Sequence, residues 1–419
     1  MVIAGFSTIV EWYDFTLYLY FATVLSRVFF GPGEQGLLTT LAGFAVAYLM
    51  RPLGAVAFGH IGDRYGRRIM MLLSVAVMTA AMLGIALLPT HAASGPIAGV
   101  MLIALRCVMG FAVGGEYTGV VAYLMEGARA ERRGLITSYA AAASEVGALL
   151  AVGISALTVS LTSDAELDSW GWRIPFLFGA VLALSVWIAR SAMEESPEFE
   201  RQRAADTIPA RPLRHALTHH RAGILRGFAI SALGSITYYV GITYVPAFLT
   251  SVGRLGEAQA LWLSTIAAVV VILVTPGIGA LSDRVGRKPV LIALAVSSAL
   301  LPISLFTLMA QGSAALALVG AVVLAGIAGA VSAVGAVATA EQLEGEARLT
   351  GLALGATFAT AIFGGVTPWL AQLLVGRTGE PAIPGLMIAL VGVAILPILI
   401  RMRETRPGGK AGRFTGAAG

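Results

Sequence analysis

Charged side chains are scarce in this chain, because Asp, Glu, Lys and Arg make up only 12% of its 419 residues. A soluble globular protein has about 25%. The chain also contains a single cysteine, Cys107, and no asparagine at all. One cysteine excludes an internal disulfide and a cysteine-based metal cluster. We interpret Cys107 as a small residue that packs between helices.

Apolar residues dominate instead: 57% of the residues are hydrophobic, and the mean hydropathy is +0.84. They gather in runs of roughly 20 residues or more, the length of helix that crosses a bilayer. The sequence therefore predicts an all-α, multi-pass membrane protein with twelve spans. We place these spans near residues 3–29, 37–60, 68–89, 96–126, 134–160, 170–191, 221–251, 257–281, 288–310, 313–340, 349–376 and 381–402.

The distribution of basic residues predicts the orientation of the spans. The first apolar run has no basic segment before it and contains Glu11 and Asp14, so we interpret it as the first span and not as a signal peptide. Arginine and lysine are concentrated in the loops after the even-numbered spans, in the interval 192–220 and in the C-terminal tail. By the positive-inside rule, these loops and both termini are cytoplasmic. The net charge of +5 reflects this bias and indicates no nucleic-acid partner.

One half of the chain repeats the other. The segment GHIGDRYGRR at 59–68 returns 220 residues later as GALSDRVGRK at 279–288. A second marker, a glutamate followed seven residues later by an arginine, occurs at Glu126 and again at Glu341, 215 residues apart. Two similar halves in a membrane are typical of a secondary transporter.

The duplication divides the chain into four predicted parts. These are an N-terminal six-helix bundle (1–191), a cytoplasmic linker (192–220), a C-terminal six-helix bundle (221–403) and a cytoplasmic tail (404–419). The linker contains His215, His219 and His220 without carboxylate or cysteine companions at a fixed spacing, so we expect solvated residues and no metal site. The sequence shows no nucleophile–base pair or phosphate-binding loop, so we predict neither a cofactor nor an enzyme.

Six segments carry a resemblance to a known family. They are EWYDF at 11–15, RPLGAVAFGHIGDRYGRR at 51–68, RCVMGFAVGGE at 106–116, WGWRIPFLFGA at 170–180, ESPEF at 195–199 and FGGVTP at 363–368. With them the chain resembles the major facilitator superfamily and, within it, the metabolite:proton symporter family. The resemblance implies two pseudo-symmetric six-helix bundles around a central cavity. It also implies proton-coupled import of small carboxylates, such as citrate, or of zwitterions, such as proline and betaine.

Neighbouring families resemble the chain less well. Drug:proton antiporters carry a Gly-Pro motif in the fifth span, where this chain has no proline. Sugar porters bind hydroxyl groups with Gln and Asn of the seventh span, whereas this chain has no asparagine. We therefore do not expect a sugar as substrate.

Glu11 and Asp14 are the predicted proton-coupling residues. An ionisable group inside the bilayer costs several kcal/mol, so each one needs a structural or functional reason. These two residues are three positions apart and share one helix face, where their negative charges disfavour simultaneous ionisation. Either of them could bind the transported proton.

Arg106, in the fourth span, is the predicted substrate anchor. Its guanidinium stays charged and presents a planar fork to a carboxylate, so it suits either an organic anion or an ion pair. The resemblance implies that Asp14 and Arg106 form such a pair. The alternative is that the pair only holds two helices together. We also include Tyr13 and Tyr117 among the predicted substrate-binding residues.

Three more intramembrane charges need a reason. Arg51 is either a second anion ligand or a donor to backbone carbonyls that Pro52 leaves without partners, and both alternatives stay open. We expect Glu116 to be a packing or gating residue near the cytoplasmic side. For Glu145 we favour a structural bond to a neighbouring helix over contact with the substrate.

Tyr238 and Tyr239 lie well inside the seventh span, where their hydroxyls need partners. Aromatic residues in membrane spans often serve only in packing or in the interfacial belt. We nevertheless predict that one of the two lines the cavity and closes over a substrate held by Arg106.

The repeated loops supply a predicted cytoplasmic latch. The resemblance implies that each loop acid meets a neighbouring helix end, while the arginines pair with glutamates and hold the two halves together. The residues of this latch are Asp63, Arg64, Arg67, Glu126, Asp283, Arg284, Arg287 and Glu341.

We predict a symporter of the bacterial inner membrane that imports a small organic anion (a mono-, di- or tricarboxylate) with protons by alternating access. In this hypothesis, protonation of Asp14, assisted by Glu11, frees Arg106 to bind the substrate carboxylate. The alternatives are a proton symporter for a zwitterionic osmolyte and a non-transporting binding protein or sensor of the same fold. We expect a monomer whose partners are substrate, protons and lipid.

Overall fold

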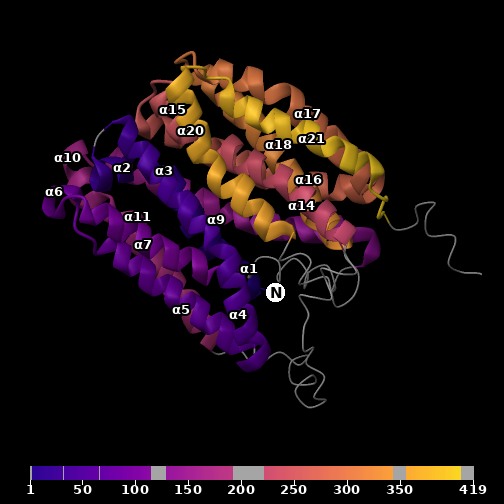
Figure 1. Ribbon diagram of the computed structural model, residues 1–419, viewed down its shortest axis with the longest axis horizontal. Helices are drawn as coiled ribbons and strands as arrows, with labels where there is room; N and C mark the ends of the chain where they lie inside the picture. Colours follow the sequence, from indigo (N-terminus) through magenta and orange to yellow (C-terminus); the bar gives the residue numbers. More distant parts are fainter. Residues whose placement is uncertain are drawn as a thin grey trace, which may run out of the picture.

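The computed structural model describes residues 2–31, 33–65, 67–114, 129–191, 221–342 and 355–406. Within these ranges the regular structure is entirely helical (Figure 1). This confirms the predicted all-α class, and it agrees with the rule that a chain in lipid satisfies its backbone hydrogen bonds within helices. The predicted linker lies outside these ranges, so the four domain boundaries stay predictions.

The first half of the chain forms the first six predicted spans. Its elements are α1 (Val2–Tyr20), α2 (Ala22–Phe30), α3 (Glu34–Leu49), α4 (Arg51–Tyr65), α5 (Arg67–Ala86), α6 (His91–Ser94), α7 (Ile97–Ala112), η1 (Ala130–Arg132), α9 (Arg133–Leu161), α10 (Asp164–Glu166), η2 (Leu167–Gly171) and α11 (Arg173–Ser191). The second span is interrupted at Met50. Pro52 lies two residues later and lacks the N–H that would continue the hydrogen-bond ladder. This interruption places Arg51 at the start of α4.

The second half forms the other six spans. Its elements are α14 (Arg221–Tyr238), η3 (Tyr239–Thr243), α15 (Val245–Ser251), α16 (Glu257–Val285), α17 (Arg287–Met309), α18 (Ala314–Glu341), η4 (Ala361–Val366), α20 (Thr367–Thr378) and α21 (Ile383–Arg401). The seventh span bends by 43°. A π-helical turn, η3, lies at the bend, and such turns are frequent at functional sites.

The described helices account for the predicted membrane crossings. Nine of the described helices are long and apolar enough to cross a bilayer, and the bent pair over residues 221–251 makes ten. The shorter apolar helix α7 and the α1–α2 pair occupy the two remaining predicted positions. Each of the twelve predicted spans therefore coincides with a described helix.

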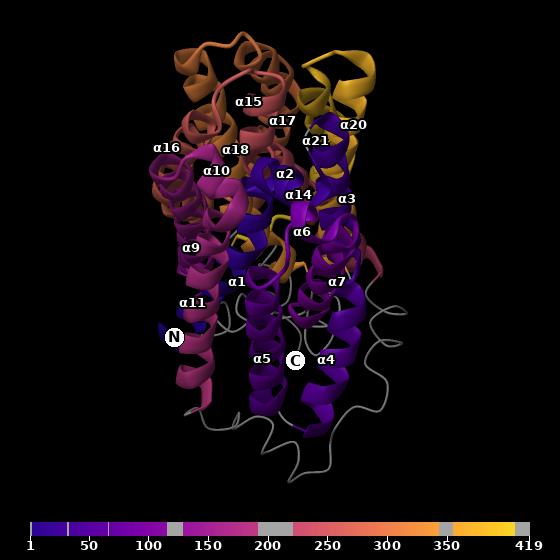
Figure 2. The ribbon, with the colours of Figure 1, turned by 90° about the vertical axis from the view of Figure 1, so that its left-hand side faces the viewer.

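The helices form two groups that follow the two halves of the chain. Figure 1 shows the first half, in indigo to magenta, beside the second half, in rose to yellow. The helices α9 and α16 lie side by side in both views (Figures 1 and 2). At one end of this contact, Nε1 of Trp262 donates to Oγ of Ser160 at 3.0 Å. At the other end, Asp283 of α16 meets the first turn of α9, so the two helices pack along their whole length.

The hydrophobic core is shared by both halves at one end of the molecule. The largest cluster of buried apolar side chains joins Phe21 and Phe44 of the first half to Tyr239 and Phe248 of the second. A separate cluster around Leu291 belongs to the second half alone. Burial of apolar and aromatic surface therefore joins the halves near α2, α3 and α15.

Candidate functional site

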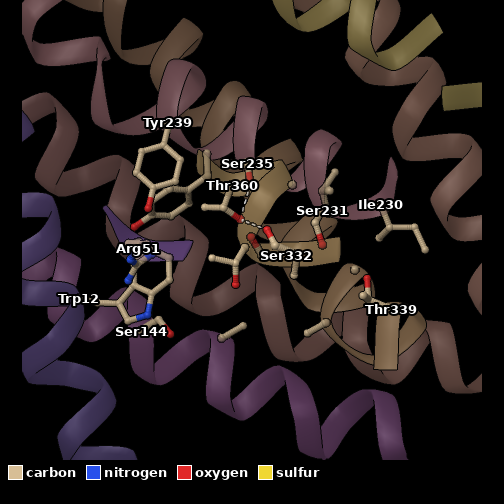
Figure 3. Close-up of a pocket in the computed structure, with 18 of the residues that line it drawn as sticks. Trp12, Arg51, Ser144, Ile230, Ser231, Ser235, Tyr239, Ser332, Thr339 and Thr360 are labelled. Atoms are coloured by element: carbon tan, nitrogen blue, oxygen red, sulfur yellow. Dashed lines mark hydrogen bonds between the residues drawn. The ribbon is translucent and has the colours of Figure 1, made fainter. Parts of the chain in front are cut away.

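A cavity of about 180 Å³ lies between the two halves. Its walls come mainly from α1, α4 and α9 of the first half and from α14, η3 and α18 of the second. In Figure 3, Trp12 and Arg51 lie at one side of this cavity, below the ring of Tyr239, and Thr339 lies at the other. Because Thr339 is close to the end of α18, the cavity runs from the aromatic rings towards that helix end.

The two halves line the cavity with different chemistry. All charged residues on the described wall, Glu11, Arg51 and Glu145, come from the first half. The second half contributes rings and hydroxyls, from Ser231, Ser235, Tyr238, Tyr239, Ser332, Thr339, Thr357 and Thr360. One pair of these hydroxyls is joined directly, since Oγ of Ser235 donates to Oγ1 of Thr360 at 3.1 Å (Figure 3).

Arg51 is held at the cavity wall by a carboxylate, a hydroxyl and two rings. Its Nη2 donates to Oε1 of Glu11 at 3.1 Å, and its Nη1 donates to the hydroxyl of Tyr48 at 2.7 Å. The guanidinium carbon lies 3.9 Å from the ring centre of Phe15. Its side chain is 12% exposed, and its Nε makes no hydrogen bond. The sequence left two roles open for Arg51, an anion ligand or a donor to backbone carbonyls. The guanidinium donates to side chains and lines the cavity, which favours the role of anion ligand.

Asp14 and Arg106 form a second ion pair that is buried away from the cavity. Nη1 of Arg106 lies 3.4 Å from each carboxylate oxygen of Asp14, and the two residues are only 2% and 0% exposed. The guanidinium carbon lies 4.7 Å from the ring centre of Tyr18 and 5.9 Å from that of Phe15. The structure thus brings the predicted pair together, but Arg106 does not line the described cavity wall. Its role as substrate anchor stays a prediction.

Aromatic rings close the cavity at the end opposite Thr339. Trp12 packs edge to face against Tyr238, with ring centres 5.3 Å apart, and Tyr238 packs in the same way against Tyr239 at 5.2 Å. The hydroxyl of Tyr239 is hydrogen-bonded to that of Tyr48. The helix η4 also lies close to Tyr48 and needs a glycine there, because a Cβ added at Gly365 would lie 2.4 Å from Cβ of Tyr48. We predicted that one of Tyr238 and Tyr239 lines the cavity, and the structure places both there.

Glu145 is the third charged residue of the cavity wall. It projects from α9, is 3% exposed, and interacts electrostatically with the hydroxyl of Tyr238. Its Oε2 and the Tyr238 hydroxyl are both without a hydrogen bond of normal geometry. Among the described residues, no cation lies within ion-pair distance of Glu145. The contact with α14 is consistent with the predicted bond to a neighbouring helix, but the residue also reaches the cavity.

The remaining predicted substrate ligands lie elsewhere. Tyr13 is fully buried, and its hydroxyl donates to the carbonyl of Pro175 at 2.7 Å. It therefore packs inside the first half, away from the described cavity wall. Tyr117 and Glu116 lie outside the described residues, so their roles stay predictions.

The second copy of the predicted latch joins the two halves. The carboxylate of Asp283 accepts hydrogen bonds from the backbone N–H groups of Gly134 and Leu135, each at 2.9 Å. A helix N-terminus attracts negative charge because its first N–H groups have no partner within the helix. Nη1 of Arg287 lies 2.8 Å from Asp283, and its Nε lies 3.3 Å from Glu341. These contacts have the form that the resemblance implies.

The other latch residues are not seen in such contacts. Arg284 is exposed, and none of the described ion pairs includes it. The side chains of Asp63, Arg64 and Arg67, together with all of Glu126, lie outside the described part of the chain. Their place in the latch stays a prediction.

The sequence analysis missed the contribution of Glu404 and Thr405. The Glu404 carboxylate accepts hydrogen bonds from the backbone N–H groups of Arg287 at 2.9 Å and Lys288 at 3.0 Å, which begin α17. Oγ1 of Thr405 donates to Oε2 of Glu341 at 2.5 Å. An acid that follows the last span and meets a helix N-terminus leaves no local signal in the sequence.

A second group of ion pairs joins the halves at the opposite end of α16. Arg27 of α2 is paired with Glu257, the first residue of α16. Nη2 of the same arginine lies 3.2 Å from Asp168 in η2. The halves are thus joined by charge at both ends of α16, with the cavity to one side of it.

The described residues offer no evident metal centre. In the part of the chain that the structure describes, no group of three His, Cys, Asp or Glu residues is placed to hold a metal ion. The linker histidines lie outside that part. The described wall of the cavity carries charged residues, hydroxyl groups and aromatic side chains.

Two transporter families match the sequence. The family described as "Sugar (and other) transporter" matches residues 1–215. The family described as "Major Facilitator Superfamily" matches residues 252–418. Together the two matches cover most of both halves.

Curated relatives cover almost the whole chain. The ectoine/proline transporter ProP of Corynebacterium glutamicum is 32% identical over 92% of this chain and 81% of its own length. The glycine betaine/proline/ectoine/pipecolic acid transporter OusA of Dickeya dadantii is 30% identical, over 96% and 82% of the two chains. The citrate-proton symporter of Klebsiella pneumoniae is also 30% identical, over 91% and 86%. All three are transporters.

Solved structures confirm the fold. A partially occluded, inward-open structure of the xylose transporter XylE from E. coli superposes with a TM-score of 0.74 and covers 96% of this chain and 97% of that one. The sequences are only 20% identical, so the likeness concerns the fold alone.

Proposed function

Because the chain belongs to the major facilitator superfamily, we propose that its cavity binds a zwitterionic osmolyte, such as proline or betaine, and imports it together with protons. This choice replaces the small organic anion that the sequence analysis favoured. The names of two similar relatives, ProP and OusA, support it. The single observation that carries it is the composition of the cavity wall, where one arginine lies on the same wall as three aromatic side chains.

The arginine suits the negative end of a zwitterion. Arg51 presents its guanidinium at the wall, and a guanidinium binds one carboxylate with two parallel hydrogen bonds. A di- or tricarboxylate needs more positive charge, but Arg51 is the one basic residue on the described wall. The second arginine, Arg106, is buried against Asp14.

The aromatic rings suit the positive end. Trp12 and Tyr238 meet edge to face at the wall, and both offer electron-rich faces to a cation. Cation–π contact with such faces is the usual way in which proteins hold a quaternary ammonium group. Arg51 and Trp12 lie on the same side of the cavity (Figure 3), so one small zwitterion can meet both residues.

The ion pair between Glu11 and Arg51 supplies a mechanism for proton coupling. While Glu11 is ionised, it occupies the guanidinium that the substrate carboxylate needs. Protonation of Glu11 removes this competitor, so substrate and proton bind together. When both have left, the pair re-forms, and the empty site carries no uncompensated charge as it returns. Asp14 and Arg106 then act chiefly as a structural pair behind the site.

Under the predicted orientation, the cavity extends towards the cytoplasmic side, where the Asp283 contact of the latch still joins the two halves. It runs from the aromatic rings towards Thr339, near the end of α18 that also carries Glu341 and the latch. We infer that this end and both termini are cytoplasmic, and that the protein is a monomer in the bacterial inner membrane. Closure at the rings and at the Arg27–Glu257 pair then seals the periplasmic side.

Uptake into proteoliposomes tests the proposal. The purified protein is exposed to labelled proline, betaine and citrate under an inward proton gradient, with Arg51→Ala and Trp12→Ala alongside. We expect gradient-driven uptake of proline or betaine, loss of uptake in Arg51→Ala, and a greater loss for betaine than for proline in Trp12→Ala.

Matched variants control for folding. Arg377→Ala removes an exposed arginine, and Trp170→Ala removes an exposed tryptophan, so neither should alter uptake. Uptake of citrate alone would restore the organic anion, which the Klebsiella pneumoniae relative transports by name. Uptake that ignores the proton gradient would refute proton coupling.

A further inference from the structure

Glu145 differs from the other buried acids of the first half. Glu11 is paired with Arg51, and Asp14 is paired with Arg106. Glu145 is equally buried, at 3% exposure, yet none of the described ion pairs includes it. One of its carboxylate oxygens makes no hydrogen bond, although the residue lines the cavity.

An isolated carboxylate at this depth is expensive to ionise. Burying an unpaired charge costs far more than burying a neutral carboxyl group, and such groups respond by binding a proton. Intramembrane acids of this kind recur along proton pathways of transporters. The surroundings of Glu145 in the conformation described therefore favour its protonated form.

The surroundings of Glu145 are also prepared for its ionised form. The hydroxyls of Tyr238 and Tyr20 both interact electrostatically with Glu145. Both hydroxyls are buried and make no hydrogen bond of normal geometry. When Glu145 is ionised, the Tyr238 hydroxyl can donate to it, which stabilises the carboxylate. The site can therefore exist with or without the proton.

Few other titratable groups face this site. The helix α1, which packs against α9, carries Glu11 and Asp14, and these are paired with Arg51 and Arg106. The helices α16 and α18 also pack against α9, but their charged residues lie only at their ends. No fixed positive charge of these helices therefore holds Glu145 in its ionised state.

We propose that Glu145 is a second proton-carrying residue, which binds one proton from the periplasmic side and releases it through the cavity to the cytoplasm in each cycle. An O–H bond forms on the carboxylate when the site faces outward, and water in the cavity accepts the proton when the site faces inward. The residue acts in addition to Glu11, so the proton-to-substrate ratio exceeds one. This inference rests on the proposed symport.

The ratio of protons to substrate is the decisive measurement. In proteoliposomes, the membrane potential that just balances a known substrate gradient gives this ratio directly. We expect Glu145→Gln to lower the ratio by one proton per substrate molecule while substrate exchange at equal pH continues. Glu380→Gln, at an exposed position, serves as the control and should keep the wild-type ratio. An unchanged ratio in Glu145→Gln would show that Glu145 has only a structural role.

Infrared spectroscopy tests the same inference without any substrate. We expect the wild-type protein to show a C=O stretching band of a protonated carboxyl group, which disappears as the pH is raised. The band should be absent from Glu145→Gln and present again in Glu145→Asp. A band that persists unchanged in Glu145→Gln would overturn the inference. If the wild type transports neither proline nor betaine, the proposed function fails, and the infrared result still decides whether Glu145 exchanges a proton.

Discussion

The hydroxyl of Tyr48 in α3 is hydrogen-bonded to the hydroxyl of Tyr239 in η3, so this bond joins the two halves at the aromatic end of the cavity. Tyr48 also accepts a hydrogen bond from Arg51. The residue that closes the aromatic end of the cavity is thus bonded to the residue that we propose binds the substrate. Occupation of Arg51 and closure of the rings are physically linked.

Tyr48→Phe tests this link. The substitution removes both hydrogen bonds of the hydroxyl, but only the bond to Tyr239 crosses between the halves. Loss of that bond costs about 1 kcal/mol, which corresponds to roughly a fivefold change in a two-state population. We expect the outward-facing state to gain by that factor. The accessibility of Ser231→Cys to an impermeant maleimide, in a Cys107→Ala background, measures the population. If labelling from the periplasmic side stays at the level of the parent, the hydroxyl contact does not control closure.

Gly365→Ala tests the close approach of α3 and η4. The added Cβ would lie 2.4 Å from Cβ of Tyr48, so the two elements must move apart, at a cost of about 1–3 kcal/mol. We expect a lower melting temperature and slower transport. Gly326→Ala is the matched control, since no atom lies within 4 Å of its added Cβ. Equal behaviour of the two variants would contradict the packing described here.

The two ion pairs of α1 should respond differently to neutralisation. Asp14→Asn leaves Arg106 charged and buried without its partner, which costs about 3–5 kcal/mol of unfolding free energy. Glu11→Gln mimics the protonated acid, and Arg51 keeps its hydrogen bond to the Tyr48 hydroxyl. We expect Asp14→Asn to lower stability strongly, and Glu11→Gln to keep stability but lose proton-driven accumulation. Thermal unfolding and proteoliposome uptake separate these outcomes, and the reverse pattern would return the coupling role to Asp14.

Glu404→Gln should loosen the latch from the tail. Its carboxylate meets two N–H groups at the start of α17, where a negative charge contributes about 1 kcal/mol. We expect the variant to unfold at a lower temperature and to label more readily at Ser138→Cys, which lies against Gly279 across the α9–α16 contact. Glu131→Gln, at an exposed position, is the control. No difference between the two variants would mean that the tail does not support the latch.

The Arg27–Glu257 pair is partly open to water, with side chains 29% and 21% exposed. Such pairs contribute about 0–1 kcal/mol, and high salt screens them. We expect Glu257→Gln to lower the melting temperature slightly. The melting temperature of the variant should also depend less on salt concentration than that of the wild type. A variant as salt-sensitive as the wild type would assign the effect to other charges.

The sequence predicted the twelve spans well, because length and hydropathy largely determine membrane helices. It also predicted Asp283, Arg287 and Glu341 as latch residues, because their repeated motif lies in the chain itself. It could not predict that Arg51 faces the cavity while Arg106 does not. The direction of a side chain depends on how its helix is rotated against its neighbours, and this rotation is set by packing that one sequence does not show.

Some missed residues left a usable signal and others did not. Tyr48 lies three positions before Arg51 and therefore on the same helical face, so it could have been proposed as its partner. Glu404 meets residues more than a hundred positions away, and only the folded structure shows this contact.

All the charged residues on the described cavity wall belong to the first half. This has a consequence for how the substrate specificity of such a protein can change. In the alternating access that we propose, the two halves move against each other as units. Glu11, Arg51 and Glu145 then move together, and no cavity ion pair has to break between the halves. The second half meets the substrate with neutral hydroxyls and rings. Substitutions in the second half can reshape the pocket for a new solute and leave the proposed proton-binding residues, Glu11 and Glu145, unchanged.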